Sequence, residues 1–598
     1  MAHQHPPLTP FPLPVLLGRI SHEWASRKRI FDLPIARFFD ASAGPDLTME
    51  FLGRPAATPV GPAAGPHTQL TENIVLSWLS GARLMELKTV QILDELEIGR
   101  PCIDMETVGY NIEWSQELKI EQSLEEYVKA WMIIEILRGW DQLEPHIGSD
   151  PGPHIFDISV GYDLAGISSE RVGAFIDGLI DASSSIDGFR DQIPEPFTQW
   201  RDHDFPTRIA DTATLSTFHG CPPDEIESIT KHLMNRHGLD VIVKLNPTLL
   251  GFERVGEIVN DVLGYSDVRL RRGDFEADLQ FERGLELIVE LERFAAENER
   301  RFGIKLTNTL VVENNRDFMP DNPMYLSGQP LHVVSTTLLG ALDEALPGML
   351  DVDGHRGSVQ VSFSAGISKD NVADGAGLGL APLTVCSDLL KPGGYGRMKP
   401  MIKALQNAIT DAGDDSLTAW RRHRHEAAVA AGHSGAIAAY IASLYDPATN
   451  ERYTREGTSK LPRSVDHSLE MWGCVACNLC VTVCPNDAFF RVPTPEGLEV
   501  DGRQQYFVFS ELCNECGNCL TFCPEEGDPA EIKPRLYLDR GRFAAEAGSQ
   551  AFLVQQANGG LEITATAGFE DEIERLHLVL DSEEGLPVRV GDLNPAAG

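Results

Sequence analysis

Two cysteine runs in the last quarter of the chain restrict its fold more than any other feature. The first reads Cys474-Val-Ala-Cys477-Asn-Leu-Cys480-Val-Thr-Val-Cys484-Pro485, and residues 513–524 repeat the same spacing. Three thiolates spaced three residues apart, with a fourth four residues on and followed by proline, are typical of chains that wrap cubane iron–sulfur clusters. In two-cluster proteins the fourth cysteine of each run ligates the other cluster.

This spacing predicts two [4Fe-4S] clusters with crossed ligands. Cluster 1 is expected on Cys474, Cys477, Cys480 and Cys523, and cluster 2 on Cys513, Cys516, Cys519 and Cys484. Two structural zinc sites are the alternative, but such sites use separated pairs of Cys or His rather than triplets followed by Cys-Pro. A module with two clusters relays electrons between a donor and an acceptor.

Composition narrows the class of protein further. The 598 residues are enough for three or four domains. Only Cys102, Cys221 and Cys386 lie outside the two runs, which favours a reducing compartment and a cytoplasmic location. The formal net charge of −39 argues against nucleic acid as a partner. We expect neither a signal peptide nor a membrane span, since no stretch of about 18 apolar residues occurs.

Between residues 45 and 410, short β-rich runs alternate with amphipathic helical patterns. Strands are expected at residues 82–90, 155–160, 209–218, 241–245, 304–312 and 359–364, and helices at residues 72–80, 124–140, 224–237, 285–300 and 332–346. This alternation predicts an α/β fold, a (β/α)₈ or TIM barrel with its functional residues on the loops after the strands. Periodicity alone leaves a doubly wound sheet as the alternative.

Six motifs at the expected strand ends follow one another in a specific order. They are residues 59–65, Glu86-Leu-Lys88-Thr89-Val90, residues 243–247, Thr307-Asn308-Thr309, Leu326-Ser327-Gly328 and Phe363-Ser-Ala365-Gly366-Ile367. Their order and chemistry resemble the FMN barrel of dihydroorotate dehydrogenases and dihydropyrimidine dehydrogenase, over roughly the first two-thirds of the chain. The resemblance implies a dihydroorotate-dehydrogenase-type barrel that binds FMN.

The residue types in these motifs suit a flavin. Small residues allow the backbone to approach the flat isoalloxazine ring, lysines stabilise negative charge on the reduced ring, and backbone N–H groups at Gly366 and Ser387 suit the phosphate. The resemblance assigns FMN to Ala64, Gly65, Lys88, Thr89, Lys244, Gly328, Ala365, Gly366 and Ser387.

Further positions match substrate and catalytic residues of the pyrimidine-reducing relatives. Asn111, Thr217, Asn308 and Thr309 are expected to hold the amide edges of a planar ring, because carboxamides both donate and accept hydrogen bonds; turn capping is their alternative role. Cys221 is the expected acid/base opposite the flavin, with His219 in reserve. The alternative for Cys221 is a small buried apolar residue.

Beyond residue 410 the alternating pattern ends. Residues 551–567 alternate around Asn558-Gly559-Gly560, which indicates a β-hairpin. The patterns predict five segments: an N-terminal extension (1–45), the FMN-type barrel (46–415), a helical bridge and linker (416–465), a 2[4Fe-4S] ferredoxin domain (466–535) and a small β appendage (536–598).

Residues 218–224, 244–248 and 111–116, together with the double cysteine run, look like the YgfK-type subunits described as selenate reductases. That family combines an FMN-type barrel, a glutamate-synthase-like FAD/NAD(P)H module and a ferredoxin domain. Here fewer than about 60 residues separate barrel and clusters, less than a nucleotide-binding domain needs. We therefore expect electrons to come from a separate FAD/NAD(P)H oxidoreductase subunit or a ferredoxin-like carrier, with a molybdenum hydroxylase as another partner, in a hetero-oligomer.

Two functions are compatible with these features. In the first, the clusters exchange electrons with FMN, which reduces a C=C or C=N bond of a small planar heterocycle of pyrimidine, purine or cyclic ureide type. In the second, the barrel has no chemistry of its own, and the chain is an electron-transfer and scaffold subunit of a larger complex. The direction of electron flow is open in both.

Overall fold

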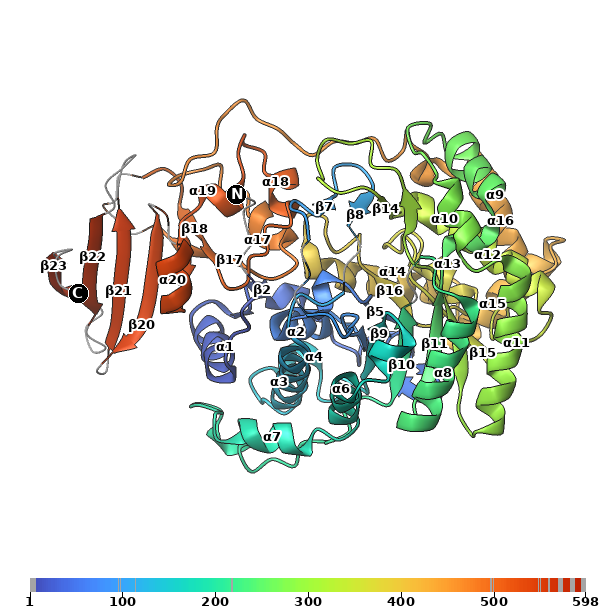
Figure 1. Ribbon diagram of the computed structural model, residues 1–598, viewed down its shortest axis with the longest axis horizontal. Coiled ribbons are helices and arrows are strands. Elements are labelled where there is room, and N and C mark those ends of the chain that lie inside the picture. The colour runs from blue at the N-terminus through green and yellow to red at the C-terminus, as the bar shows by residue number, and fades with distance from the viewer. Residues whose placement is uncertain are drawn as a thin grey trace. The chain divides into compact units, whose positions relative to one another are not determined.

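The computed structural model describes residues 7–592 except 95, 97, 113–114, 217–218, 495–496, 498–499, 547, 549, 558–559, 568–573 and 581–586. The chain divides into two compact units (Figure 1). The first unit is Pro12–Leu461, and the second combines Met1–Phe11 with Pro462–Gly598.

Eight parallel strands form a barrel in the first unit. Their order around the barrel is their order along the chain: β5 (Val60–Pro62), β6 (Leu84–Glu86), β9 (Ile155–Gly161), β10 (Thr212–Ser216), β11 (Asp240–Leu245), β12 (Phe302–Leu306), β15 (Val359–Phe363) and β16 (Leu383–Val385). Seven neighbouring pairs are hydrogen-bonded parallel ladders. The expected TIM barrel is confirmed.

The barrel is nearly closed where its first two strands meet. There the backbone N–H of Arg83 donates to the carbonyl of Val60 at 3.1 Å. A Cβ atom at Gly61 would lie 1.6 Å from the carbonyl oxygen of Leu84, so only glycine permits this approach of β5 to β6.

Helices cover the outside of the barrel, as the amphipathic patterns predict. The five expected helices occur as α2 (Thr71–Leu79), α3 (Ile120–Arg138), α8 (Pro223–His237), α11 (Phe281–Glu297) and α12 (Gln329–Ala345). The other α-helices described in this unit are α1 (Leu13–Arg27), α4 (Glu144–Ile147), α5 (Leu164–Ile167), α6 (Glu170–Ile180), α7 (Ser183–Arg190), α9 (Phe252–Gly256), α10 (Arg272–Ala277), α13 (Val372–Gly377), α14 (Met398–Asp411), α15 (Leu417–Ala430) and α16 (Ala436–Tyr445).

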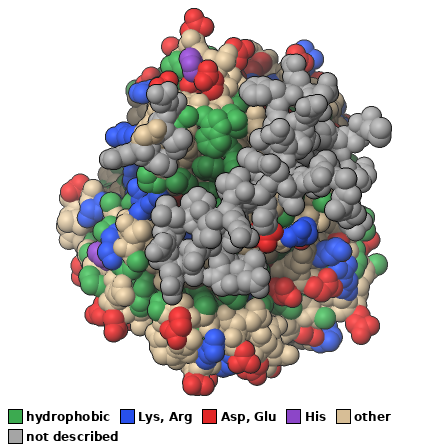
Figure 2. Space-filling view, turned by 90° about the vertical axis from the view of Figure 1, so that its left-hand side faces the viewer, with side chains coloured by type: hydrophobic (Ala, Val, Ile, Leu, Met, Phe, Trp, Pro, Cys, Tyr) green, Lys and Arg blue, Asp and Glu red, His purple; other side chains and the backbone are tan. Residues whose placement is uncertain are grey.

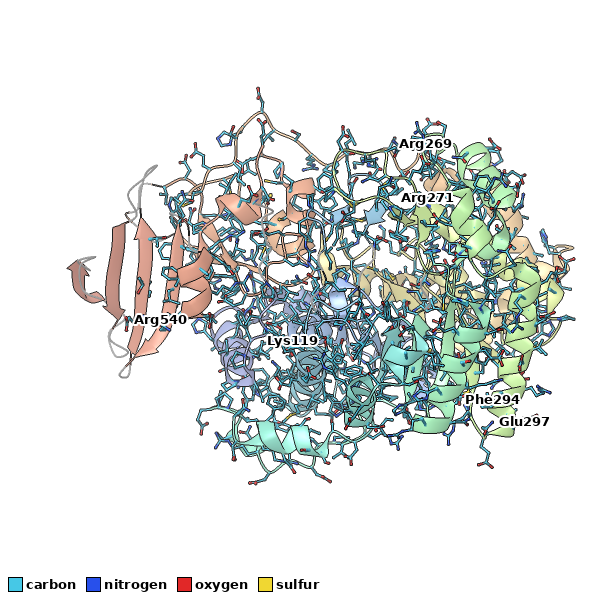
Figure 3. The ribbon with its side chains drawn as sticks, in the orientation of Figure 1. Lys119, Arg269, Arg271, Phe294, Glu297 and Arg540 are labelled. Carbon is cyan, nitrogen blue, oxygen red and sulfur yellow. The ribbon has the colours of Figure 1, made fainter. Side chains whose placement is uncertain are left out.

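A separate four-stranded antiparallel sheet, here called the cap sheet, is built from loops that follow β6 and β12. It contains β7 (Ile103–Asp104), β8 (Gly109–Asn111), β13 (Leu310–Val312) and β14 (Met324–Ser327). Figure 3 shows Arg269 and Arg271, beside β13, at one end of the barrel, and Phe294 and Glu297, in the last turns of α11, at the other.

Two short hairpins precede the barrel: β1 (Arg29–Ile30) with β2 (Leu33–Pro34), and β3 (Met49–Phe51) with β4 (Arg54–Ala56).

The expected strand at residues 304–312 was wrong as a single element. β12 ends at Leu306 inside the barrel, and β13 begins at Leu310 in the cap sheet. The three residues between them, Thr307 to Thr309, leave the barrel wall. β5 and β16, of three residues each, were not among the expected strands.

The second unit contains a seven-stranded sheet with the order β17-β18-β19-β20-β21-β22-β23. Its strands are β17 (Phe489–Pro493), β18 (Gln504–Phe509), β19 (Arg535–Tyr537), β20 (Ala551–Ala557), β21 (Gly560–Ala567), β22 (Glu574–Leu580) and β23 (Pro587–Asp592), and its helices are α17 (Leu479–Val483), α18 (Asn518–Phe522), α19 (Pro529–Ile532) and α20 (Arg540–Glu546). β20 and β21 pair antiparallel, which confirms the expected hairpin; Asn558 and Gly559 lie outside the described residues.

Among the described residues, no helix is both long and apolar enough to cross a membrane. On the face drawn in Figure 2, acidic and basic side chains are interspersed.

Candidate active site and cluster ligands

A cavity lies at the C-terminal ends of the barrel strands and is lined by loops from both the barrel and the cap sheet. Of the residues expected to hold FMN or substrate, the cavity brings together Ala64, Gly65, Lys88, Thr89, Asn111, Lys244, Asn308, Thr309, Gly328, Gly366 and Ser387. Ala365, His219 and Cys221 do not line it. Thr217 lies outside the described residues.

One wall of the cavity consists of small residues, Ala63, Ala64 and Gly65. A Cβ atom at Gly65 would approach the Sγ of Cys386 to 3.2 Å, so a larger residue would crowd that side. Cys386, whose side chain has no expected role in the site, lines the same cavity. A wall without bulky side chains suits the flat face of an isoalloxazine ring.

Charged groups are packed beneath this wall inside the barrel. Glu86 on β6 pairs with Lys305 on β12, and both are almost fully buried. Lys305 also donates to the hydroxyl of Thr384 at 2.7 Å. Burial alone would raise the pKa of Glu86, but the ammonium groups of Lys305 and Lys244 and a hydrogen bond from the Ala64 backbone lower it. The carboxylate of Glu86 therefore anchors the small-residue wall.

A second carboxyl group in the barrel interior belongs to Asp157 on β9. It accepts hydrogen bonds from the hydroxyls of Thr212 and Thr214, each at 2.6 Å. Burial raises the pKa of Asp157 to about 7, even though these hydrogen bonds act in the opposite direction.

The ammonium groups on the cavity surface are those of Lys88 and Lys244, both largely buried. Their positive charge suits an anionic ring edge or phosphate.

The side of the cavity formed by Asn308 and Thr309, here called the carboxamide side, is supported by a chain of hydrogen bonds. Asn308 Nδ2 donates to Asn246 Oδ1 at 2.7 Å, and Asn246 Nδ2 donates to Asp278 Oδ2 at 3.2 Å. Because Asp278 only accepts when ionised, it fixes the orientation of both carboxamides.

Asp278 is held in its ionised form by several donors. It accepts from the hydroxyl of Thr248 at 2.7 Å, from the backbone N–H of Gly220 and from His219 Nδ1 at 2.7 Å. Burial alone would raise the pKa of Asp278, but the hydrogen bond and charge of His219, with Thr248 and Gly220, lower it. The carboxylate lies outside the cavity and acts on it through Asn246.

His219 faces a hydrogen-bond acceptor at each of its ring nitrogens. Its Nδ1 faces Asp278, and its Nε2 lies 3.2 Å from the carbonyl oxygen of Thr309. Both partners are acceptors, so an imidazolium with a proton on each nitrogen satisfies both contacts. The ring stacks on Tyr325 with centroids 5.7 Å apart. Sequence reasoning placed His219 near the site but missed Asp278, which is 59 residues away in a loop without a motif.

Cys221, the expected acid/base, is buried next to this pair. Its thiol has the carbonyl of Pro222 at 3.9 Å. Burial, with the negative charges of Glu225 and Asp278, raises the pKa of Cys221 to about 12. The assignment of Cys221 stays a prediction.

The loops around Gly328, Gly366 and Ser387 form the part of the cavity here called the glycine side. Ser327 and Ser387 share a hydrogen bond of 2.8 Å between their hydroxyls. Gly366 has a φ of +57°, and a Cβ atom there would lie 2.3 Å from the carbonyl oxygen of Gly328. Glycine is therefore required where these two loops meet. Hydroxyls, glycine backbone and nearby lysines are the groups that bind phosphate.

In the second unit, the cysteines gather into the two sets of four that the spacing predicts. Cys474, Cys477, Cys480 and Cys523 line one cavity. Burial, Asp528 and the neighbouring thiols of Cys516, Cys513 and Cys484 raise the pKa of Cys519. Each set therefore takes three thiols from one run and one from the other, which suits a group with four thiolate ligands.

Two family models match this chain. Residues 31–434 match the model described as oxidoreductase YgfK, N-terminal TIM-barrel domain, and residues 473–526 match the 4Fe-4S dicluster domain. The curated YgfK of Escherichia coli strain K12, named as a proposed oxidoreductase, is 40% identical over 421 residues, which are 67% of this chain and 39% of YgfK. The protein of the same name from Escherichia coli O157:H7 matches to the same extent. The match thus spans about two-fifths of the length of these relatives.

Two further similarities are weaker. An uncharacterized iron–sulfur protein of Methanocaldococcus jannaschii is 28% identical over 91 residues, which cover 13% of this chain and 19% of that protein. The crystal structure of DHODH from Eimeria tenella in complex with ferulenol aligns with 70% of this chain and 96% of its own, at 15% identity and a TM-score of 0.41.

Proposed function

Because the chain belongs to the family of the YgfK oxidoreductase N-terminal TIM-barrel domain and carries a 4Fe-4S domain, we propose that it is an iron–sulfur flavoprotein oxidoreductase. In this proposal the barrel cavity binds FMN, and two [4Fe-4S] clusters connect it to an electron donor or acceptor. The reaction is the reduction of a C=C or C=N bond in a small planar heterocycle, or its reverse.

The observation that carries this proposal is the set of residues that line the cavity. Side chains from motifs hundreds of residues apart meet there: a wall of small residues, two lysines, and a carboxamide from each of two elements. A flat ring with an anionic edge fits the small-residue wall and the lysines. A heterocycle with C=O and N–H groups fits the two carboxamides. These are the residue types that the flavin and its substrate need.

The roles of the chain's own residues follow from their positions. Bound FMN would supply hydride transfer and couple it to the single-electron chemistry of iron–sulfur clusters. Lys88 and Lys244 stabilise negative charge at the ring edge, and Asn111 and Asn308 orient the substrate through its amide groups. Cys221 Sγ is the proposed proton donor, with His219 as the alternative.

The proposed complex includes a second redox protein. A separate FAD/NAD(P)H oxidoreductase subunit or a ferredoxin-like carrier would exchange electrons with the clusters, and a molybdenum hydroxylase is a further partner of the right chemistry. We place this hetero-oligomer in the cytoplasm, where thiols stay reduced.

Quantitative analysis of FMN, FAD, iron and sulfide in the anaerobically purified chain tests the proposal. About one FMN and about eight iron atoms per chain are expected. Eight iron atoms without FMN would contradict the reductase and support the electron-transfer and scaffold function. With FMN bound, heterocycles can be screened by the bleaching or return of flavin absorbance.

The role of Cys221 requires a separate variant. Cys221→Ala should keep FMN and lower turnover by about two orders of magnitude or more if the thiol is the acid. Unchanged turnover would assign the proton to His219 or to water.

A further inference from the structure

Two carbonyl groups on the glycine side of the cavity are held from behind. The ring nitrogen Nδ1 of His332 lies 2.8 Å from the carbonyl oxygen of Ala365. The side-chain Nδ2 of Asn371 donates to the carbonyl oxygen of Gly366 at 3.0 Å. His332 is on α12 and Asn371 precedes α13, so both hydrogen bonds come from helical elements behind the loop that follows β15.

These hydrogen bonds determine where the adjacent N–H groups point. In a trans peptide the C=O and the N–H of the same plane are antiparallel. The carbonyls of Ala365 and Gly366 are drawn back, so the N–H groups of Gly366 and Ile367 point the opposite way. Both residues line the cavity. Within the described part of the chain, neither N–H donates to a backbone or side-chain acceptor of the protein.

The orientation of His332 is itself fixed by a chain of hydroxyls. Its Nε2 lies 2.8 Å from the hydroxyl of Tyr440, which lies 3.0 Å from the hydroxyl of Tyr453. The rings of His332 and Tyr453 stack, with centroids 5.2 Å apart and planes 6° apart.

Burial and the carbonyl of Ala365 together favour a neutral His332 with its proton on Nδ1. Because Ala365 offers only an acceptor, Nδ1 of His332 carries the proton and Nε2 accepts from Tyr440. Burial lowers the pKa of His332 to about 4, which keeps the imidazole neutral. Tyr440 and Tyr453 both come from the segment after the barrel.

We propose that His332 and Asn371 are positioning residues that aim the N–H groups of Gly366 and Ile367 at the phosphate of FMN. Two converging backbone N–H groups next to a residue in the left-handed region form an anion-binding nest. The supporting ring is neutral, so the attraction comes from backbone dipoles and depends on their direction. The inference rests on the proposed function, because FMN is the expected ligand.

This arrangement would make the site selective for the phosphorylated flavin. Riboflavin has the same ring but no phosphate, so it can use the small-residue wall and the lysines but not the nest. The preference of the protein for FMN over riboflavin therefore measures how much the nest contributes to binding. The affinity for riboflavin serves as the control for the rest of the cavity.

The test compares the dissociation constants of FMN and riboflavin, measured by quenching of flavin fluorescence in the full-length chain. Asn371→Asp removes the donor to Gly366, but the new carboxylate can still accept from the N–H of Ser368, as Asn371 does at 2.8 Å. His332→Leu removes the contacts of the ring with the Ala365 carbonyl, the Tyr440 hydroxyl and the Asn371 side chain. We expect each variant to raise the Kd of FMN about 10-fold to 100-fold and to change that of riboflavin less than about 3-fold.

A conservative variant provides the matched control. His332→Gln keeps an amide donor within reach of the Ala365 carbonyl and should restore most of the preference for FMN. If His332→Leu does not fold, Asn371→Asp and Tyr440→Phe decide the question, since Tyr440→Phe removes only the hydroxyl that orients His332.

The outcomes separate this inference from the proposed function. If the variants lose affinity for FMN and riboflavin equally, or if the wild type binds both flavins equally, the inference of a phosphate-binding nest is overturned. The flavin site itself would remain. A wild type that binds neither flavin overturns the proposed function, and the inference with it.

Discussion

On the carboxamide side of the cavity His219 is paired with a carboxylate, whereas on the glycine side His332 is paired with a tyrosine hydroxyl. Both imidazoles lie outside the cavity, and both act on it through backbone carbonyls or carboxamides. The first has acceptors at both ring nitrogens, which suits an imidazolium. The second has one acceptor and one hydroxyl and is neutral.

The difference follows from what each side has to orient. Carboxamides can present either end to a ligand, so a nearby charge, here Asp278, is needed to select one orientation. Backbone N–H groups have a fixed direction once the peptide plane is set, so neutral hydrogen bonds suffice. A cation in the place of His332 would place a charge in a fully buried position, which costs free energy.

The largest effect is expected from removing the charge on the carboxamide side. Asp278→Asn leaves the His219 imidazolium without its counter-ion in a buried site, and the free energy of unfolding should fall by about 4 kcal/mol, measured by urea denaturation. Thr248→Val, which removes a single hydrogen bond to the same carboxylate, is the control and should cost about 1 kcal/mol. Equal losses in the two variants would show that the pair carries no charge.

The second prediction concerns pH and the glycine side. The pKa of His332 is about 4 in the folded protein against 6.5 ordinarily, so between these values the unfolded chain binds a proton that the folded chain does not. Stability is therefore lost as the pH falls from 6.5 to 4, by about 3 kcal/mol for this group.

Denaturation at several pH values checks this window. His332→Gln has no titrating group, so the difference in unfolding free energy between wild type and variant should shrink as the pH falls. Buried His67 also has a lowered pKa, but it is present in both proteins and cancels in the difference. A difference that stays constant from pH 7 to pH 4.5 would refute the neutral assignment.

A smaller effect is expected from separating the functions of the two sides. Asn308→Leu should lower kcat/KM for a heterocycle found by screening about 10-fold to 100-fold, because the carboxamide no longer orients the ring, and leave the Kd of FMN unchanged within about 3-fold. Asn371→Asp should show the reverse: it should weaken the binding of FMN but leave kcat/KM normal at saturating FMN. If both variants change both constants alike, the two sides do not act separately.

The smallest effect is expected at Tyr453, the last residue in the row of hydrogen bonds that runs from His332 through Tyr440. Tyr453→Phe removes a hydroxyl but leaves His332 bonded to Tyr440 and stacked on the new ring. The Kd of FMN should rise by about 3-fold or less, with less than about 1 kcal/mol lost from the free energy of unfolding. An effect as large as that of His332→Leu would show that Tyr453, rather than Tyr440, orients the imidazole.

Much of the fold could be predicted from short-range patterns. The alternation of β-rich runs and amphipathic helices is local, so the barrel and all five expected helices were recognised. The strand expected at residues 304–312 was not, because only three residues, Thr307 to Thr309, separate the two apolar segments while the chain passes from the barrel to the cap sheet. Periodicity does not record a change of sheet.

Most cavity residues could also be predicted, because their motifs stand at strand ends and a barrel brings strand ends together. Asp278, His332 and Tyr440 could not. Asp278 lies in a polar loop, His332 begins an expected helix, and Tyr440 lies in a segment expected to be a bridge outside the barrel. Charged residues inside apolar runs, such as Glu86 and Lys305, were the one available signal of buried pairing.

The sequence by itself determined the barrel, the grouping of the eight cysteines of the two runs, and the small residues and lysines of the cavity, because each depends on spacing along the chain or on the end of a strand. Only the tertiary structure decided which groups stand behind the cavity. The His219–Asp278 pair and the His332–Tyr440 pair join residues 59 and 108 apart in sequence. Such contacts arise when the barrel closes and its helices pack, and no local pattern of residues encodes them.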